Sequence, residues 1–368
     1  MTATLAPSRA TLIPATYDLP KSVRLGALAV VTAALVLFPV VFPNPAVTSV
    51  GVFAMIYLLS VSGWNIFSGY SGYIALGHAV FFGIGQYSSA LLTNHLKIPP
   101  GWDSFALLPV AGALAGLAAI PIGFLLLRVR KHTFIVLTIA VMFIFQLFAF
   151  NLRSWTGGSQ GLQMPFPTWQ GSFFNEPFYY VGLGASAIAL VTSWWVRRSK
   201  FGLGLLAIRD DEDRARSLGV HTTRTKLIAF VISAVFVGAA GAIYAPFVGS
   251  VFPQFAFDPS FDLALAVMAF TGGLGTVVGP ALGALVIGSA QQYFLLQFGG
   301  ANTFLIVYGL LFVLILRLLP AGVVPSIAMR WRQWVVYRER TRSQAPPAPP
   351  PGLEPRVGVS ADPSGAAR

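Results

Sequence analysis

Ten long apolar runs, separated by short polar stretches, limit what this chain can fold into more than any other feature of its sequence. They cover approximately residues 25–42, 47–67, 78–95, 105–127, 134–150, 179–196, 225–249, 260–275, 279–297 and 303–319. A helix needs roughly 20 apolar residues to cross a hydrocarbon core of about 30 Å. The runs lack strand alternation, and a spanning segment must satisfy its own backbone polar groups. The sequence therefore predicts an all-α, polytopic integral membrane protein with about ten transmembrane helices.

Composition leads to the same conclusion. The chain has 368 residues, of which 55% are hydrophobic and 10% are charged, whereas a soluble domain carries about 25% charged residues. So little charge cannot cover a water-facing globule of this size, and the outer surface must therefore face lipid. The chain has no cysteine, which excludes disulfides, thiolate metal sites and cysteine nucleophiles.

Positive charge is in excess and is unevenly placed. The formal net charge is +12, from 24 Lys and Arg against 12 Asp and Glu. A basic chain could bind nucleic acid, but these cations lie between apolar runs, where they orient a membrane protein. We therefore expect no nucleic-acid partner. With the amino terminus inside, the inner segments hold Arg128, Arg130, Lys131, Arg197, Arg198, Lys200, Arg209, Arg214, Arg216, Arg224, Lys226, Arg330, Arg332, Arg338 and Arg340. The predicted outer loops hold only Lys97 and Arg153, so ten spans with both termini in the cytoplasm fit the asymmetry.

The two ends of the chain differ from its middle. Residues 1–24 are too long and too interrupted by proline for the basic start of a signal peptide. We expect a cytoplasmic amino-terminal segment, an uncleaved first span, and a transmembrane domain over residues 25–325. Residues 326–368 would form a cytoplasmic tail, either functional or inert. From about residue 341 it is rich in Pro, Ala, Gly and Ser and should be disordered, because it cannot bury enough apolar surface.

Two segments are unusually rich in glycine. The first holds Gly69, Gly72, Gly77, His78 and Gly83, and the second holds Gly272, Gly273, Gly275 and Gly279. Irregular backbone at membrane depth is tolerated where protein or a watery cavity satisfies it. These residues are therefore candidates for a translocation pathway, although glycine also allows ordinary close helix packing. Pro280 fits the first turn of a helix that follows the second break.

Three ionisable residues near these segments have two interpretations each. His78 could gate or bind a solute, or it could be a neutral histidine bonded to a nearby backbone carbonyl. Asp258 and Asp262 flank Pro259 and could attract a cationic group. The alternative is a helix cap, with Asp258 at the helix start.

The inner loop at 197–226 is the strongest local feature. Its centre holds Arg209, Asp210, Asp211, Glu212, Ala215, Leu218 and Gly219. Leu205, Ile208, Ala215 and Leu218 recur at helical spacing, which predicts a short amphipathic helix with its charges on the other faces. Gly219 is a plausible helix stop. Such a helix suits docking to another protein, or it is a solvated loop helix that binds nothing.

The longest outer loop, 151–178, opens with Thr156, Gly157, Gly158 and Gly161 and contains several aromatic residues. It could contact an external binding protein or cap the pathway. A plain turn with interfacial aromatic residues is the alternative.

Several motifs follow one another in a fixed order over about residues 47–325. They are Ser68-Gly-Tyr-Ser-Gly, Leu76-Gly-His-Ala-Val-Phe-Phe-Gly-Ile-Gly, Thr156-Gly-Gly-Ser-Gln-Gly-Leu, Ala207-Ile-Arg-Asp-Asp-Glu, Leu218-Gly-Val, Lys226-Leu-Ile-Ala-Phe-Val-Ile-Ser-Ala, Gly238-Ala-Ala-Gly-Ala-Ile-Tyr and Gly272-Gly-Leu-Gly-Thr-Val-Val-Gly-Pro-Ala-Leu-Gly-Ala. Together they resemble the branched-chain amino-acid permease family of ABC importers, and most closely its longer, M-type subunit. The chain departs from the family pattern at Asp213 and Arg214, and at Arg130-Lys-His-Thr-Phe.

The resemblance implies an ABC-importer permease fold in the bacterial inner membrane. It also implies four partners: a second related permease subunit, two cytoplasmic ATP-binding subunits and a periplasmic solute-binding protein. The segment from Arg209 to Gly219 would be the coupling helix that enters a groove on the ATPase. Branched-chain amino acids are the solutes that the resemblance suggests first, and similar permeases carry other amino acids, urea, amides or small aromatic acids.

Taken together, these features predict a transport subunit with no catalytic residues, no metal site and no cofactor of its own. No phosphate-binding loop of the Gly-x-x-x-x-Gly-Lys-Ser/Thr type occurs in the sequence, so ATP would be bound by partner subunits. Two rivals remain. An ion-coupled carrier or passive channel usually keeps ionisable residues in mid-membrane, and a membrane enzyme needs convergent acids, bases or metal ligands.

Overall fold

The computed structural model describes residues 21–167, 169, 171–298, 309, 310 and 317. The chain divides into two units, residues 1–325 and 326–368, and every described residue belongs to the first. The predictions made for residues 1–20, for most of the run at 303–319 and for the tail lie outside the described residues.

The described part of the chain is almost entirely helical. The long elements are α1 (Lys21–Val41), α2 (Pro45–Trp64) with the π turn η1 (Asn65–Gly69), α3 (Ala79–Leu96), η2 (Trp102–Leu107) with α4 (Leu108–Leu126), α5 (Lys131–Asn151), α7 (Asn175–Arg198), α10 (Thr222–Val248), α12 (Pro259–Gly272), and the series α13 (Val278–Gly283), η5 (Ala284–Gly288) and α14 (Ser289–Phe298). Short elements are α6 (Arg153–Thr156), η3 (Gly158–Gln160), β1 (Leu162–Gln163), η4 (Gly171–Phe174), α8 (Lys200–Asp210), α9 (Glu212–Ser217), β2 (Ser250–Val251) and α11 (Pro253–Ala256).

Length and apolar composition qualify six helical stretches of the described residues as membrane spans. They are Pro45–Gly69, Trp102–Leu126, Lys131–Asn151, Asn175–Arg198, Thr222–Val248 and Pro253–Gly272. Helices also occupy the first, third and ninth predicted runs, as α1, α3 and the α13–α14 series. The prediction of an all-α, polytopic membrane protein is confirmed.

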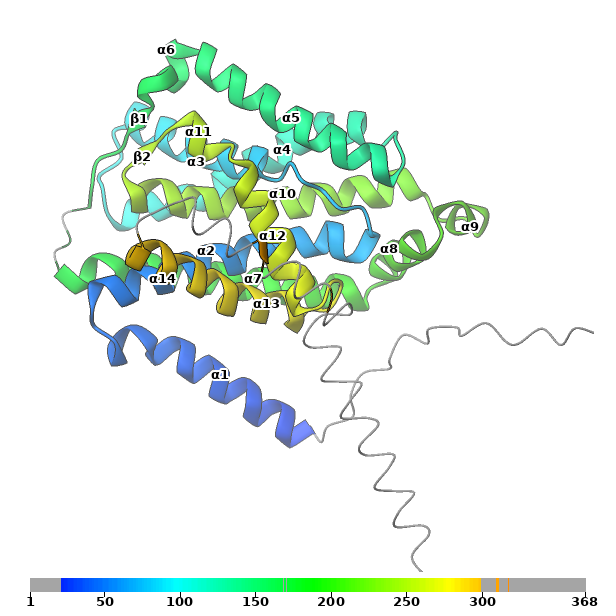
Figure 1. Ribbon diagram of the computed structural model, residues 1–368, viewed down its shortest axis with the longest axis horizontal. Helices are drawn as coiled ribbons and strands as arrows, with labels where there is room; N and C mark the ends of the chain where they lie inside the picture. The colour runs from blue at the N-terminus through cyan, green and yellow to red at the C-terminus, as the bar shows by residue number, and fades with distance from the viewer. Residues whose placement is uncertain (1–20, 168, 170, 299–308, 311–316, 318–368) are drawn as a thin grey trace, which may run out of the picture. The chain divides into compact units, whose positions relative to one another are not determined.

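Helix α10 packs against α2, α3 and α4 (Figure 1). Glycines allow its close approach to α3. A Cβ atom on Gly85 would lie 1.9 Å from the carbonyl oxygen of Gly238, and one on Gly241 would lie 2.1 Å from that of Phe82. Both distances are far below van der Waals contact, so the two backbones can meet only because these positions lack side chains.

The loops gather at two opposite ends of the helices. One end holds α8 and α9, and the other holds α6, β1 and β2 (Figure 1). At the first end, Arg130 and Asp213 form an ion pair at 3.5 Å. At the second, β1 pairs antiparallel with β2, and Asn94 Nδ2 donates to the carbonyl of Gln163 at 3.1 Å. Loops predicted to be inside thus lie at one end, and loops predicted to be outside lie at the other.

The inner loop differs from its prediction in two respects. It forms two helices, α8 and α9, because Asp211 caps a new amino terminus: its carboxylate accepts from the backbone N–H of Arg214 at 3.0 Å. Leu218 does not join the buried face of Leu205, Ile208 and Ala215 but is 78% exposed, since it lies beyond the last helical residue. Gly219 adopts a left-handed conformation with φ 87° and ends α9 as predicted.

Candidate functional site

The first glycine segment is an irregular stretch that side chains hold in place. After η1 and two further helical residues, residues 72–78 run without regular helix or strand until α3 begins at Ala79. Trp64 Nε1 donates to the carbonyl of Ala75 at 2.8 Å, and the N–H of Ala75 donates to Ser68 Oγ at 3.2 Å. The N–H of Leu76 donates to Thr138 Oγ1 on α5 at 3.2 Å. Side chains of two helices therefore replace part of the missing helical hydrogen bonding.

A buried aspartate caps the start of α3. Asp262 Oδ1 accepts from the backbone N–H groups of His78 and Ala79 at 2.8 and 3.2 Å. Asp258 caps its own helix as predicted, accepting from the N–H of Ser260 at 2.8 Å. Sequence reasoning missed the role of Asp262 because the helix that it caps begins 183 residues earlier.

His78 is fully buried beside the rings of Phe67, Phe81 and Phe230. Its Nε2 atom lies 2.7 Å from the hydroxyl of Ser233 on α10. The partner is a side-chain hydroxyl, so the predicted bond to a backbone carbonyl is wrong. In this conformation His78 is closed off from solvent.

The second glycine segment joins α12 to α13. Gly273 and Gly275 adopt positive φ angles of 121° and 78°, which other residues rarely adopt. A Cβ atom on Gly272 would lie 1.7 Å from the carbonyl oxygen of Gly279, so the two helices meet backbone to backbone. Pro280 lies in the first turn of α13, as predicted.

One asparagine brings the two glycine segments together. Asn65 Nδ2 donates to the carbonyl of Thr276 at 2.8 Å, and its Oδ1 accepts from the N–H of Gly275 at 3.0 Å. A Cβ atom on Gly69 would lie 3.1 Å from the nitrogen of Gly275. Sequence reasoning missed Asn65, which no glycine pattern or charge singled out.

Two other glycines of the first segment contact different elements. A Cβ atom on Gly77 would lie 2.4 Å from the carbonyl oxygen of Thr138 on α5, and one on Gly83 would lie 2.3 Å from the ring of Phe257. These two positions account for close packing, whereas Gly69, Gly72 and Gly275 surround a single side chain.

That side chain is Arg209, near the end of α8. Its Nη1 atom donates to the carbonyl of Gly69 at 3.0 Å. A Cβ atom would lie 2.8 Å from Arg209 Cγ if placed on Gly72, and 2.3 Å from Arg209 Nη1 if placed on Gly275. Lys131 Nζ donates to the carbonyl of Arg209 at 2.9 Å. Arg209 therefore fills the space that both segments leave free and joins α8 to them.

Glu212, the first residue of α9, makes a second connection. Its Oε2 atom accepts a hydrogen bond from the hydroxyl of Tyr73, and its Oε1 atom accepts from Lys226 Nζ at 2.7 Å. The Lys226 side chain is only 2% exposed. Burial alone would raise the pKa of Glu212, but the hydrogen bonds from Lys226 and Tyr73 outweigh it and lower the pKa below the ordinary value. Glu212 is therefore ionised at neutral pH and ties α9 to the first glycine segment and to α10.

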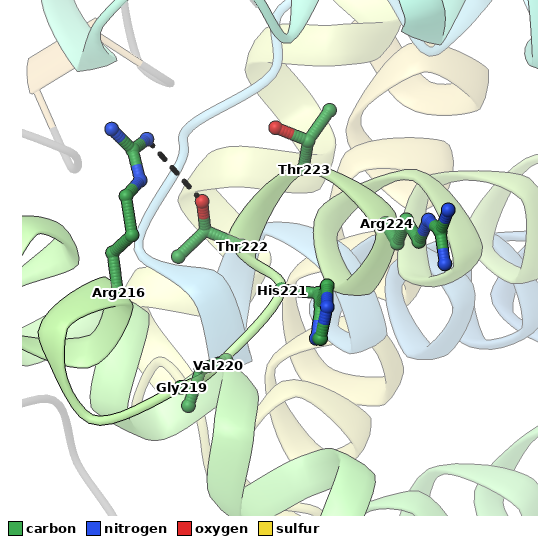
Figure 2. Close-up of a pocket in the computed structure, with 7 residues that line it drawn as sticks. All are labelled: Arg216, Gly219, Val220, His221, Thr222, Thr223 and Arg224. Atoms are coloured by element: carbon green, nitrogen blue, oxygen red, sulfur yellow. Dashed lines mark hydrogen bonds between the residues drawn. The ribbon is translucent and has the colours of Figure 1, made fainter.

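The remaining residues of the predicted coupling segment divide by burial. Ala215 is buried, whereas Asp210, Asp211, Leu218 and Gly219 are exposed. Beside them, the turn between α9 and α10 encloses an open pocket of 460 Å³ (Figure 2). Its lining consists of Arg216, Gly219, Val220, His221, Thr222, Thr223 and Arg224. Arg216 Nη2 donates to Thr222 Oγ1 at 3.4 Å, whereas Arg224 points away from both (Figure 2). The exposed end of α8 and α9, which together are called the α8–α9 hairpin below, is thus polar and carries a pocket.

The outer-loop motif forms a closed turn. Gly157, Gly158 and Gly161 all have positive φ angles, of 72°, 57° and 68°. The N–H of Gly158 donates to Thr156 Oγ1 at 3.2 Å. A Cβ atom on Gly161 would lie 2.5 Å from the carbonyl oxygen of Val251, so the turn packs on β2. Its glycines are explained by their positive φ angles. They therefore do not decide whether the loop contacts a binding protein or caps the pathway.

Comparison with known proteins identifies the family to which this chain belongs. The family described as "Branched-chain amino acid transport system / permease component" matches residues 46–316. The chain belongs to this family. It is 30% identical over 313 residues to the high-affinity branched-chain amino acid transport system permease protein LivM of Escherichia coli strain K12, covering 75% of this chain and 72% of that protein.

A second relative is the LivH permease protein of Salmonella typhimurium strain LT2, at 26% identity over 291 residues, or 73% of this chain and 91% of LivH. A shorter match, 28% identical over 143 residues, is to the autoinducer 2 import system permease protein LsrC of Enterobacter sp. strain 638, covering 36% of this chain and 40% of LsrC. No solved structure matches the chain. The resemblance found in the sequence motifs is confirmed, and the chain is a multi-pass permease of a transport family.

Proposed function

We propose that this chain is one of two related permease subunits of an ATP-driven importer in the bacterial inner membrane, with both termini cytoplasmic. Two cytoplasmic subunits bind and hydrolyse ATP, and this chain binds no nucleotide. A periplasmic solute-binding protein delivers the solute to the outer end, at residues 151–178. The observation that carries the proposal is the pair of connections from the α8–α9 hairpin to the glycine segments, through Arg209 and Glu212.

The hairpin is the part that the ATP-binding subunits move. The exposed residues Asp210, Asp211, Leu218 and Gly219 present its outer face to them. The inner face carries Arg209, which bonds to the carbonyl of Gly69 and packs on Gly275. A rigid-body shift of the hairpin therefore displaces both glycine segments. Such a shift can drive transport only if ATP binding or hydrolysis changes the free-energy difference between the two positions of the hairpin.

The solute is a branched-chain amino acid. LivM of Escherichia coli and LivH of Salmonella typhimurium are named for the transport of branched-chain amino acids. The membership of this chain in their family supports the same solute class here.

An ion-coupled carrier is the rival function, and Asp262 is the residue that would favour it. A buried carboxylate inside a membrane protein is often an ion or proton site. Here both oxygens of Asp262 accept hydrogen bonds from the first N–H groups at the start of α3. Capping accounts for the burial of this carboxylate, so no coupling ion is needed.

Uptake by a reconstituted complex tests the proposal. The chain is placed in liposomes with its second permease, its ATP-binding subunits and its binding protein, and the uptake of labelled leucine is measured. We expect uptake to require ATP and to be unchanged by a proton uncoupler. Uptake that persists without ATP and collapses with the uncoupler would instead establish the carrier.

A further inference from the structure

The irregular segment after η1 alternates between a buried and an open side. Ser71, Tyr73, Ala75 and Gly77 are buried, whereas Gly72, Ile74 and Leu76 are partly exposed. This alternation is the two-residue period of an extended chain. One side of the segment is therefore fully buried. On the other side Arg209 covers Gly72, and Ile74 and Leu76 touch the core but remain partly exposed.

The segment lies within the depth range of α10. Lys226 Nζ contacts the Tyr73 hydroxyl at 3.2 Å, and Ser233 contacts His78. These two positions on α10 are seven residues apart, which corresponds to about 10 Å along a helix. The segment thus rises from the inner end of α10 into the span.

Backbone polar groups of this segment lack partners. Within the described residues, the carbonyl groups of Tyr73, Ile74 and Leu76 and the N–H of Ile74 make no hydrogen bond. Lipid cannot satisfy such groups, and irregular backbone at membrane depth occurs only where protein covers it or a watery cavity meets it. A neighbouring transmembrane helix would pair these carbonyls only through polar side chains, as Trp64 does at Ala75, because its own N–H groups are already used within the helix.

We infer that the partly exposed side of residues 74–76 lines the inner part of the translocation pathway and contacts an aliphatic amino acid in transit. Backbone carbonyls accept hydrogen bonds from its ammonium group, the N–H of Ile74 donates to its carboxylate, and Ile74 and Leu76 contact its aliphatic side chain. This inference rests on the proposed importer function and names the solute class at one segment of it.

Thiol labelling tests whether this side is wet. The chain has no cysteine of its own, so each introduced thiol is unique in it. A charged methanethiosulfonate reagent reacts with the thiolate, which forms in water and not in lipid or in a packed core. In inverted vesicles that contain the assembled complex, Ile74→Cys and Leu76→Cys should react about tenfold faster than two controls. The controls are Ala75→Cys, on the buried side of the same segment, and Leu117→Cys, whose side chain is 63% exposed on the apolar helix α4.

Added solute tests the contact itself. Saturating leucine should slow the labelling of Ile74→Cys and Leu76→Cys several-fold, and glutamate should not. Labelling as slow as at Ala75→Cys, in two variants that insert at normal yield, would overturn the inference. Fast labelling that leucine leaves unchanged would overturn the solute contact. These results need no ATP, so they are separable from a failure of ATP-dependent uptake.

Discussion

Glu212 shows how one side chain can stabilise a site through several partners. It accepts hydrogen bonds from Tyr73 and from Lys226, and Arg216 lies 3.6 Å from the same carboxylate. Lys226 is nearly inaccessible to water, so its charge depends on Glu212 for compensation. Removing one partner of a buried ion pair costs more than the pair contributes, because it leaves the other charge unpaired.

We expect Glu212→Gln to lower the free energy of unfolding by about 3 kcal/mol, because the charge of Lys226 is left without its counter-ion. The matched control is Asp213→Asn, which breaks the exposed ion pair with Arg130, whose two side chains are 88% and 68% exposed. It should cost about 0–1 kcal/mol. Denaturation of the purified chain in detergent measures both. Equal effects of the two changes would contradict the role given to Glu212.

The same ion pair predicts a pH dependence. The folded-state pKa of Glu212 is lowered, so its contribution to stability is fully present above the ordinary glutamate pKa of about 4.3. It is lost as the pH falls through the lower folded-state pKa. Between neutral pH and pH 3, the stability of the unaltered chain should therefore fall more steeply than that of Glu212→Gln. If the stabilities of the two chains fell in parallel with pH, the ionised form of Glu212 would not be favoured in the folded state.

Local roles of single residues were predictable and long-range roles were not. The helix cap at Asp258 and the helix end at Gly219 follow from neighbours a few residues away. The partners of Asp262 and Asn65 lie roughly two hundred residues away in the chain. Nothing in the spacing of one sequence encodes such a contact, so neither of the two interpretations of His78 identified its partner, the hydroxyl of Ser233.

At the scale of elements, the α8–α9 hairpin is the unit that connects an exposed, charged surface to the glycine segments. Its outer face is exposed and charged, and its inner face carries Arg209 and Glu212. Apolar spacing predicted the buried positions Leu205, Ile208 and Ala215. It did not predict the break, because the capping preference of Asp211 ends one helix and starts another within the same apolar pattern.

We expect Arg209→Gln to reduce ATP-driven leucine uptake at least about tenfold. The substitution removes the contact between the hairpin and Gly69, and the loss of about 1.4 kcal/mol corresponds to a factor of ten. ATP hydrolysis by the complex should persist, since the outer face of the hairpin is unchanged. The control is Arg128→Gln, which removes an exposed arginine from the turn between α4 and α5, outside the hairpin. The ratio of leucine transported to ATP hydrolysed measures coupling. An unchanged ratio in Arg209→Gln would exclude Arg209 as the connection.

At the scale of the whole transmembrane unit, apolar length and charge placement were sufficient to predict the helices and to group the loops. The π turns at 65–69 and 284–288 and the capped start of α3 were not predictable. They depend on packing between elements rather than on hydropathy. The order of the spans could thus be predicted from the sequence, whereas the positions of the π turns and of the irregular segment before α3 could not.

The orientation of the unit can be measured with two introduced thiols. Asp103→Cys lies at an exposed position in the predicted outer loop before α4, and Arg224→Cys lies at an exposed position at the start of α10. Because Lys and Arg concentrate on the cytoplasmic side, an impermeant thiol reagent should label only Asp103→Cys in intact spheroplasts. In inverted vesicles it should label only Arg224→Cys. The opposite pattern would reverse the orientation.

Asn65 also determines how sequence changes in the two glycine segments can combine. Its single amide is bonded to Thr276 and to Gly275, so a displacement of either segment is transmitted to the other. The free-energy effects of substitutions in the two segments should therefore depart from simple addition. A graft of one segment from a relative, without the other, should therefore perturb the contact between them even where each segment is intact by itself.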